Sequence, residues 1–368
     1  MELFAGAGGL ALGISNEGFE HEAVVEWDKD ACTTLKYNTS WPIHHIDVNK
    51  FDFSQIKDDI DLLAGGPPCQ PFSIGGKHKG FNDTRDMFPS FLKAVRELKP
   101  RAILIENVKG LLRESFSQYF EYIILQLNYP EITRIENENW INHLARLEQH
   151  HTSYRYFNGL TYKVVFRLLN AADYGVPQRR ERVFIVAFRE DLNVDWSFPC
   201  PTHSRNVLQY IKSNGEYWNK HSISNPQWYS KRVLEIQENI FEDALMPWRT
   251  VRDAISDLLE SFDEKETGIL NHNFVPGARI YPGHTGSQLD EPAKTLKAGV
   301  HGVPGGENMI AFSNGEVRYF TIREAARIQT FPDNFVFNSS WTESMRQLGN
   351  AVPMELAKIL ARSIAKKL

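Results

Sequence analysis

The sequence contains little cysteine, and its cysteines form no recognisable pattern. Only Cys32, Cys69 and Cys200 occur among 368 residues, and no two of them make a Cys-x-x-Cys pair. Scattered thiols argue against a disulfide framework and against a zinc site, so we expect no metal and a reducing cytoplasm. The sequence also lacks an apolar run of membrane-spanning length and an N-terminal signal pattern, so we expect no membrane partner.

An excess of positive charge, which often marks a nucleic-acid binder, is missing as well. The formal net charge is -5 at pH 7. This value does not exclude nucleic acid, because binding depends on a local basic face rather than on the total charge. Hydrophobic residues make up 42% of the sequence, so a packed core is expected. The length suits one large domain and a smaller one.

The N-terminal stretch lacks both a P-loop lysine and a strict Gly-x-Gly-x-x-Gly pattern, yet it predicts a ligand-binding turn. Residues 2–13 predict a strand, a glycine-rich turn and a helix. A second strand over residues 23–28 contains Glu26, about twenty residues beyond the turn, where a carboxylate can reach ribose hydroxyls. Together these features indicate a cofactor that contains adenosine. Asp47 ends a third predicted strand, and either accepts from an adenine amino group or caps a turn.

The clearest motif surrounds Cys69. Residues 60–64 predict a short buried strand, after which Gly65-Gly66 permits a tight turn and Pro67-Pro68 stiffens the chain. The Cys69 thiol is thereby placed at the carboxyl end of a strand, where open α/β sheets bind ligands. Taken alone, the motif also fits a buried structural cysteine. The basic, glycine-rich stretch from Ser73 to Arg85 predicts a flap that contacts phosphates, and its alternative is a solvated loop.

Further charged residues lie at the ends of predicted strands. Residues 101–108 predict a strand that carries Glu106 directly after four apolar residues. A carboxyl group there is costly to bury alone, so it is either paired or protonated. Residues 160–170 and 182–188 predict two more strands, which flank the basic stretch 178–182. At least one of its arginines is expected to point inward, where a guanidinium suits a base edge or a phosphate.

Strands alternating with helices predict an α/β fold with a doubly wound, mostly parallel sheet. We expect a catalytic and cofactor-binding domain over residues 1–195, completed by the helix 345–368. Residues 196–344 predict a smaller, irregular β-rich domain, because glycine, proline and histidine become frequent there. Residues 134–151 are expected to form a surface insertion. Thr321 and Glu324 predict a capping box at the start of a helix.

Seven motifs, taken in order, resemble those of the DNA (cytosine-5) methyltransferases of bacterial restriction-modification systems. The resemblance spans nearly the whole chain. It rests on residues 4–9, 26–27, 67–70, 106–108, 178–182, 323–332 and 349–353.

The resemblance implies a class I, Rossmann-like methyltransferase fold that binds S-adenosylmethionine and releases S-adenosylhomocysteine. It implies that the Cys69 thiolate adds to C6 of cytosine, that Glu106 protonates N3, and that Arg182 holds O2. Arg180 either ties down a loop or assists at the base. The expected cofactor contacts are Phe4, Gly6, Gly9, Glu26, Trp27, Asp47, Val48, Pro68, Phe88 and Asn350. The expected substrate contacts are Ser73, Lys77, Lys79, Arg85, Gln178 and Thr295.

The expected partner is double-stranded DNA, from which the target cytosine must be flipped out. Target specificity is expected in residues 200–318, and a dimerisation or structural domain is the alternative for this span. We expect a monomer in the bacterial cytoplasm, associated with the nucleoid when it acts. The alternatives are an RNA (tRNA) cytosine-5 methyltransferase, whose usual Cys-Phe-Thr tripeptide is absent here, a nucleotide-dependent oxidoreductase, and a DNA-binding regulator with a relic active site.

Overall fold

The computed structural model describes residues 1–68, 86–153, 157–224, 245–258, 262, 268–282, 285–298 and 308–368. The chain forms two compact units, and each combines segments that are distant in sequence. Unit 1 comprises Met1–Leu169, Glu181–Phe198 and Leu360–Leu368, and unit 2 comprises Asn170–Arg180 and Pro199–Ile359. The expected functional domains, 1–195 with 345–368 and 196–344, stay a prediction, because compactness alone assigns no role.

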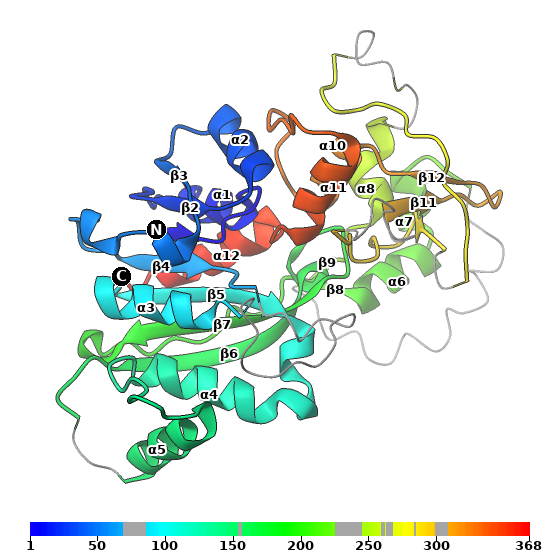
Figure 1. Ribbon diagram of the computed structural model, residues 1–368. Helices are drawn as coiled ribbons and strands as arrows, with labels where there is room; N and C mark the ends of the chain where they lie inside the picture. Colours follow the sequence, from blue (N-terminus) through cyan, green and yellow to red (C-terminus); the bar gives the residue numbers. More distant parts are fainter. Residues whose placement is uncertain are drawn as a thin grey trace. The chain divides into compact units, whose positions relative to one another are not determined.

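Unit 1 is built on a seven-stranded sheet in the order β3-β2-β1-β4-β5-β7-β6 (Figure 1). The chain begins at β1, winds outward to β3 on one side, and then continues through β4 and β5 on the other. The pairs among β1 to β5 are parallel, whereas β7 runs antiparallel to β5. The predicted doubly wound, mostly parallel sheet is therefore confirmed. The strands are β1 Glu2–Leu3, β2 Val24–Glu26, β3 Ile43–His45, β4 Leu62–Gly65, β5 Ala102–Val108, β6 Tyr162–Asn170 and β7 Glu181–Arg189.

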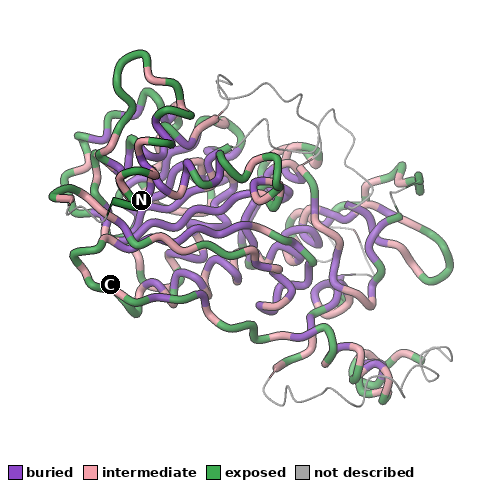
Figure 2. Tube along the Cα trace, turned by 90° about the horizontal axis from the view of Figure 1, so that it is seen from below, coloured by how far each residue is buried: buried purple, intermediate pink, exposed green. Residues whose placement is uncertain are grey.

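Both faces of this sheet are covered, so its central strands are buried (Figure 2). Successive strand residues point to opposite faces. Leu3, Val25 and Ile105 belong to a core cluster with residues of α3, α4 and α5, whereas Val24 packs against Leu35 of α2. The helices of unit 1 are α1 Gly9–Ser15, α2 Lys29–Asn38, α3 Phe88–Leu98, α4 Ser117–Asn128, α5 Trp140–Thr152 and the end of α12 Met354–Ala365.

Residues 134–151 do not form the expected surface insertion, because α5 contributes to the core of unit 1. Leu144 and Leu147 are buried, and His143 is 1% exposed. The Nε2–H of His143 donates to the Ile132 carbonyl at 2.8 Å, and its Nδ1 accepts from the Tyr122 hydroxyl at 2.8 Å. Burial lowers the pKa of His143, as suits a neutral ring. The polar composition of this stretch conceals one apolar helix face.

Unit 2 has short strands, as predicted, but more helix than its composition indicated. A three-stranded sheet has the order β10-β11-β12, and β8 pairs with β9. Capping boxes begin α8 at Thr250 and α10 at Thr321, the second as predicted. None of the described helices is both long and apolar enough to cross a bilayer. The elements are β8 His203–Ser204, α6 Arg205–Ser213, α7 Glu216–Lys220, β9 Met246–Pro247, α8 Val251–Ile255, β10 Ser287–Gln288, β11 Met309–Ala311, β12 Val317–Tyr319, α10 Ile322–Ile328 and α11 Trp341–Asn350.

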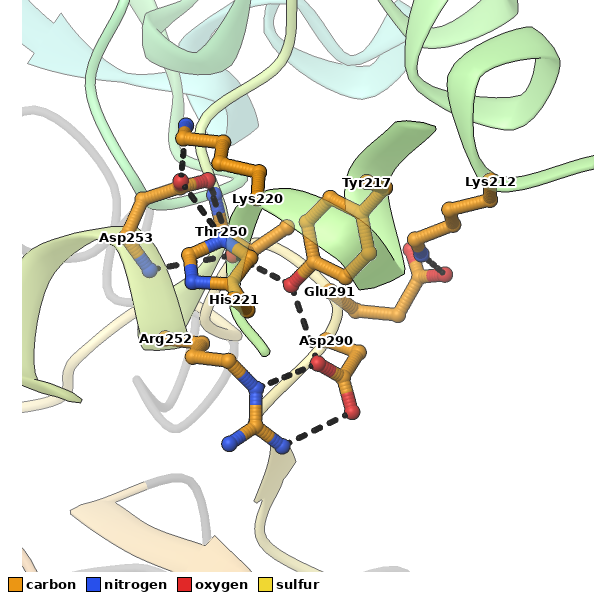
Figure 3. Close-up of polar contacts among 9 residues, drawn as sticks. All are labelled: Lys212, Tyr217, Lys220, His221, Thr250, Arg252, Asp253, Asp290 and Glu291. Carbon is orange, nitrogen blue, oxygen red and sulfur yellow. Dashed lines mark hydrogen bonds and ion pairs between the residues drawn. The ribbon is translucent and has the colours of Figure 1, made fainter. Parts of the chain in front are cut away.

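A polar network supports the region of unit 2 around α6, α7 and α8 (Figure 3). The Tyr217 hydroxyl donates to Asp290 at 2.9 Å, and Arg252 holds the same carboxylate through bonds of 2.6 and 3.1 Å. Lys212 is only 1% exposed, and its ammonium group lies 2.7 Å from Glu291. Because a buried lysine requires a partner, this part of unit 2 depends on charge pairs between residues distant in sequence.

Candidate active site and cofactor site

The turn between β1 and α1 has an unusual backbone. Phe4, Gly6 and Gly8 all have positive φ, at 58°, 54° and 81°. A Cβ at Gly8 would lie 2.5 Å from Cδ2 of Leu35, so this position also requires glycine for close packing. A Cβ at Gly6 would meet no described atom within 4 Å. The backbone of Gly6 is therefore accessible to a ligand, just before Gly9 begins α1.

Glu26, at the end of β2, fastens this turn to the sheet. One carboxylate oxygen accepts from the Gly6 N–H at 2.7 Å, and the other accepts from the Trp27 and Asp28 N–H groups at 2.8 Å each. Burial raises the pKa of Glu26, while these backbone donors oppose that shift. A carboxylate has about four acceptor positions, so it can still accept from a hydroxyl group.

Apolar residues expected at the cofactor site gather near the turn. Val48 and Phe88 belong to the core cluster on one face of the sheet, and Phe4 packs against that cluster. Trp27 differs from them because 75% of its surface is exposed. An exposed indole offers a flat face on which an adenine ring can stack.

Asp47 caps the short helix Val48–Lys50. Its Oδ1 accepts from the backbone N–H of Asn49 at 2.9 Å and from the Asn49 side chain at 3.0 Å. The capping alternative raised by the sequence is therefore confirmed. Among the described residues, Oδ2 of Asp47 makes no hydrogen bond, so the cap leaves one oxygen of this carboxylate available to a ligand.

Residues 65–68, which precede the expected nucleophile Cys69, are tightly packed. A Cβ at Gly65 would lie 2.5 Å from the Leu3 carbonyl oxygen, which explains the glycine at the end of β4. The buried Pro67 carbonyl accepts from Nδ2 of Asn107 at 3.0 Å, and the exposed Pro68 carbonyl accepts from the Met87 N–H at 3.2 Å. Cys69, Ser73, Lys77, Lys79 and Arg85 lie outside the described residues.

Glu106 and Arg182 meet beside residues 65–68. The register pairs Gly65 of β4 with Ile105 of β5, and a Cβ at Gly66 would lie 3.4 Å from Oε2 of Glu106. Nε of Arg182 lies 2.9 Å from Oε1 of Glu106, and both side chains are largely buried. This N–H does not point at the oxygen, which has no hydrogen bond to a described residue. Glu106 is thus ion-paired, one of the two states expected for it.

Arg180 and Gln178 belong to unit 2 and are fully buried there. The Arg180 guanidinium donates to the Leu296 carbonyl at 3.2 Å and to the Gly349 carbonyl at 2.9 Å. Gln178 donates to Gln329 at 3.1 Å and accepts from the Leu296 N–H at 2.9 Å. These contacts support the expectation that Arg180 ties down a loop. Gln178 is 0% exposed, so its side chain is directed into unit 2.

Two further expected contacts also lie in unit 2. Thr295 is half-buried, and its hydroxyl donates to the Arg179 carbonyl at 2.7 Å. Asn350 is exposed at the end of α11. The preceding Gly349 approaches another backbone segment so closely that a Cβ would lie 2.3 Å from the Ala298 nitrogen. The position of Asn350 is therefore set by a backbone contact that only glycine permits.

Sequence reasoning assigned no role to several residues that support the site. Asn107 lies within the motif at residues 106–108, but its bond to Pro67 joins residues 40 positions apart. The Tyr119 hydroxyl donates to Asp86, whose other oxygen accepts from the Phe88 N–H at 3.1 Å. An aspartate two residues before a helix was the only local signal for this second contact.

Known proteins resemble this chain over nearly its whole length. A family model for C-5 cytosine-specific DNA methylase matches residues 1–130 and 124–366. Type II methyltransferase M.Eco47II of Escherichia coli is 33% identical over 369 residues, which cover 99% of this chain and 78% of the relative. Type II methyltransferase M.NgoMIV of Neisseria gonorrhoeae is 33% identical over 371 residues, covering 100% of this chain and 97% of the relative.

A crystal structure of a Spodoptera frugiperda DNMT2 mutant resembles the chain with a TM-score of 0.58. Its sequence identity is 19%, and the match covers 99% of this chain and 98% of the other. At this identity, the likeness concerns the fold.

Proposed function

The chain belongs to the C-5 cytosine-specific DNA methylase family and is a DNA (cytosine-5) methyltransferase, and from this premise we propose that Cys69 is its covalent nucleophile. The Cys69 thiolate forms a bond to C6 of a flipped-out cytosine, while Glu106, which must be protonated when the base is bound, delivers its proton to N3 and Arg182 holds O2. S-adenosylmethionine, when bound, would supply an electrophilic methyl group on its sulfonium for transfer to C5, and S-adenosylhomocysteine would be the leaving group. Loss of the C5 proton to water expels the Cys69 thiolate, the N3 proton returns to Glu106, and 5-methylcytosine is left.

The observation that carries this assignment is the position of Glu106. The register of β4 and β5 places its carboxylate against Gly66, three residues before Cys69. Arg182 of β7 reaches the same carboxylate from the neighbouring strand. An acid and a guanidinium are thus held together next to the chain that leads to the nucleophile, as the reaction requires.

The residues of unit 1 also suit the proposed cofactor. The carboxylate of Glu26 would accept from the ribose hydroxyls, and Asp47 would accept from the adenine amino group through Oδ2. Trp27 supplies an exposed aromatic face, and Gly6, whose positive φ favours glycine, places no side chain over the turn. These features fit an adenosine group and leave the methionyl part to the glycine-rich turn and Pro68.

The proposed DNA substrate is a duplex with a specific site, recognised by residues 200–318 of a monomer. Loops can vary in sequence without disturbing the catalytic sheet, and polar side chains on them can read base edges. We further propose that the enzyme is the modification partner of a restriction enzyme, since the two relatives described above are named type II methyltransferases.

Trapping with 5-fluorocytosine tests the catalytic assignment. DNA from a host that expresses the chain is first sequenced for 5-methylcytosine to identify the site, and a duplex with that site then carries the fluorinated base. Wild-type protein should form a covalent adduct, because fluorine cannot leave C5 as a proton. Cys69→Ser should form none, whereas Cys200→Ser, which alters an exposed thiol, should behave like wild type. Methyl transfer by Cys69→Ser, or a preference for tRNA over the duplex, would contradict the proposal.

Exchange of residues 200–318 with those of a relative tests the recognition assignment. Gln178 and Arg180 bind backbone atoms of Leu296. Because these partners are backbone atoms, the segment taken from the relative can supply them whatever side chain it carries there. A chimera that methylates the relative's site supports the assignment. A folded chimera that keeps the original site contradicts it.

A further inference from the structure

A chain of hydrogen bonds runs from Asp47 to α3, outside the residues assigned to the cofactor. Asn49 binds Oδ1 of Asp47 twice, through its backbone N–H at 2.9 Å and its side-chain Nδ2 at 3.0 Å. Ser90, in the first turn of α3, donates its hydroxyl to Oδ1 of Asn49 at 2.5 Å. Residues 47, 49 and 90 thus form a continuous relay within unit 1.

The Asp47 carboxylate, which can only accept, sets the orientation of the Asn49 amide, and the Ser90 hydroxyl stabilises that orientation. An amide presents one acceptor and two donors, and the two ends are nearly equal in shape. The nitrogen of Asn49 is therefore turned toward the Asp47 carboxylate, and the amide oxygen accepts from Ser90. The reversed amide would place an oxygen against a carboxylate oxygen, which is repulsive.

Met87 closes the other side of this relay. Its sulfur lies 3.7 Å from Nδ2 of Asn49 and 3.9 Å from the Ser90 hydroxyl oxygen. Thioether sulfur is a weak acceptor, so Met87 does not compete with Asp47 for the amide protons. The relay therefore has one favoured arrangement, in which Asp47 is held through Oδ1 and presents Oδ2.

From this geometry we infer that Asn49 and Ser90 are positioning residues for recognition of the purine 6-amino group. The inference rests on the proposed cofactor site. Asn49 occupies one carboxylate oxygen of Asp47, so that the other is left to accept from the amino group. A carboxylate with one oxygen bound cannot rotate freely, so the donor of the ligand meets an acceptor that is already oriented. Ser90 acts through Asn49 and does not touch the ligand.

The next short helix supplies a matched control. Asp52 caps helix Phe53–Gln55 in the same way, because its Oδ1 accepts from the Ser54 N–H at 3.0 Å and from the Ser54 hydroxyl at 2.7 Å. None of the predicted cofactor contacts involves this second cap. Ser54→Ala therefore removes an equivalent capping bond without altering the relay.

The test is calorimetric binding of two ligands. One is S-adenosylhomocysteine, and the other is its analogue with oxygen in place of the purine 6-amino group. Wild type should prefer the amino compound. Asn49→Ala and Ser90→Ala should weaken the binding of S-adenosylhomocysteine by about tenfold, the usual effect of losing one hydrogen bond to a charged group. The affinity for the 6-oxo analogue should change by less than about twofold. Ser90→Thr, which keeps the hydroxyl, should restore the preference, and Ser54→Ala should match wild type.

The outcomes separate this inference from the cofactor assignment. An equal loss of affinity for both ligands in Asn49→Ala would indicate a merely structural role and would overturn the inference. Unchanged binding in both alanine variants would also overturn it while leaving the cofactor site intact. Failure of wild type to bind S-adenosylhomocysteine would overturn the cofactor site and the inference together. Thermal unfolding of each variant shows that the protein compared is folded.

Discussion

Asn107 gives the sharpest test of how the sheet supports the nucleophile. Its side chain is 5% exposed, donates to the Pro67 carbonyl at 3.0 Å and accepts from the Val108 N–H at 2.9 Å. Asn107→Ala removes both bonds and leaves a buried carbonyl without a donor. Such a loss costs about 2 kcal/mol of unfolding free energy. Cys69 follows Pro67 by two residues, so the change also loosens the approach of the thiol.

The loss of stability should not by itself slow catalysis, because a protein that loses about 2 kcal/mol of unfolding free energy stays mostly folded. A displacement of about 1 Å at a reacting group lowers a rate by about a hundredfold. We therefore expect single-turnover methyl transfer by Asn107→Ala to fall by about ten- to a hundredfold, while cofactor affinity stays near wild type. Asn107→Asp should be at least as slow, because it turns a carboxylate oxygen toward the Pro67 carbonyl. Asn128→Ala is the control, since its amide donates to the Ile124 carbonyl at the same 3.0 Å but on α4.

The relative rates of methyl transfer by these variants test this reasoning. If Asn107→Asp, which keeps the shape of asparagine, transfers methyl groups at the wild-type rate, then Asn107 only fills space. If Asn107→Ala and Asn128→Ala slow the reaction equally, the loss reflects general stability. Either result would refute the reasoning that links Asn107 to the nucleophile through Pro67.

Three further predictions concern the cofactor turn, pH and unit 2. Glu26→Ala removes the acceptor of three backbone N–H groups, so calorimetry should find at least about tenfold weaker cofactor binding, and DNA affinity should not change. Burial lowers the pKa of His21 to about 4 from 6.5, so its contribution to stability is complete above pH 6.5 and is lost as the pH falls toward 4. Denaturant titrations should show a loss of about 3 kcal/mol across this window, and a smaller loss in His21→Gln. Gly349→Ala puts a Cβ 2.3 Å from the Ala298 nitrogen and 2.4 Å from the Lys297 carbonyl carbon, so it should cost about 2 kcal/mol or more in unfolding free energy.

The sheet and the glycine turn could be predicted because their signals are local. Residues 101–108 contain four successive apolar residues followed directly by an acid. The strand β5 matches this stretch within one residue. Glu26 lies near the end of one predicted strand and Gly6 follows another, so both are likewise recognisable from the sequence. Local chemistry therefore predicted which residues reach the carboxyl edge of the sheet.

The contacts that organise these residues carry no local signal. The Asn107 amide and the Pro67 carbonyl meet only because β4 and β5 are neighbours, and Arg180 reaches Gly349 across 169 positions. α6 was missed because its buried residues include Lys212, which the sequence presents as a surface residue. Its partner Glu291 lies 79 positions further on. Long-range partners of this kind become visible only once the chain is folded.

The discontinuous course of the chain has a consequence for its synthesis. Unit 1 includes residues 360–368, which are made only after all of unit 2. This segment is fastened at several points: Arg362 pairs with Glu17 at 2.9 Å, Ser363 accepts from the Trp196 indole at 3.2 Å, and the Leu368 carbonyl accepts from Arg101 at 2.7 Å. A ribosome that stops early therefore releases unit 1 without the end of α12 and its contacts. A prematurely terminated chain should therefore be bound by chaperones or degraded by proteases. It should not yield a unit 1 that methylates DNA without unit 2.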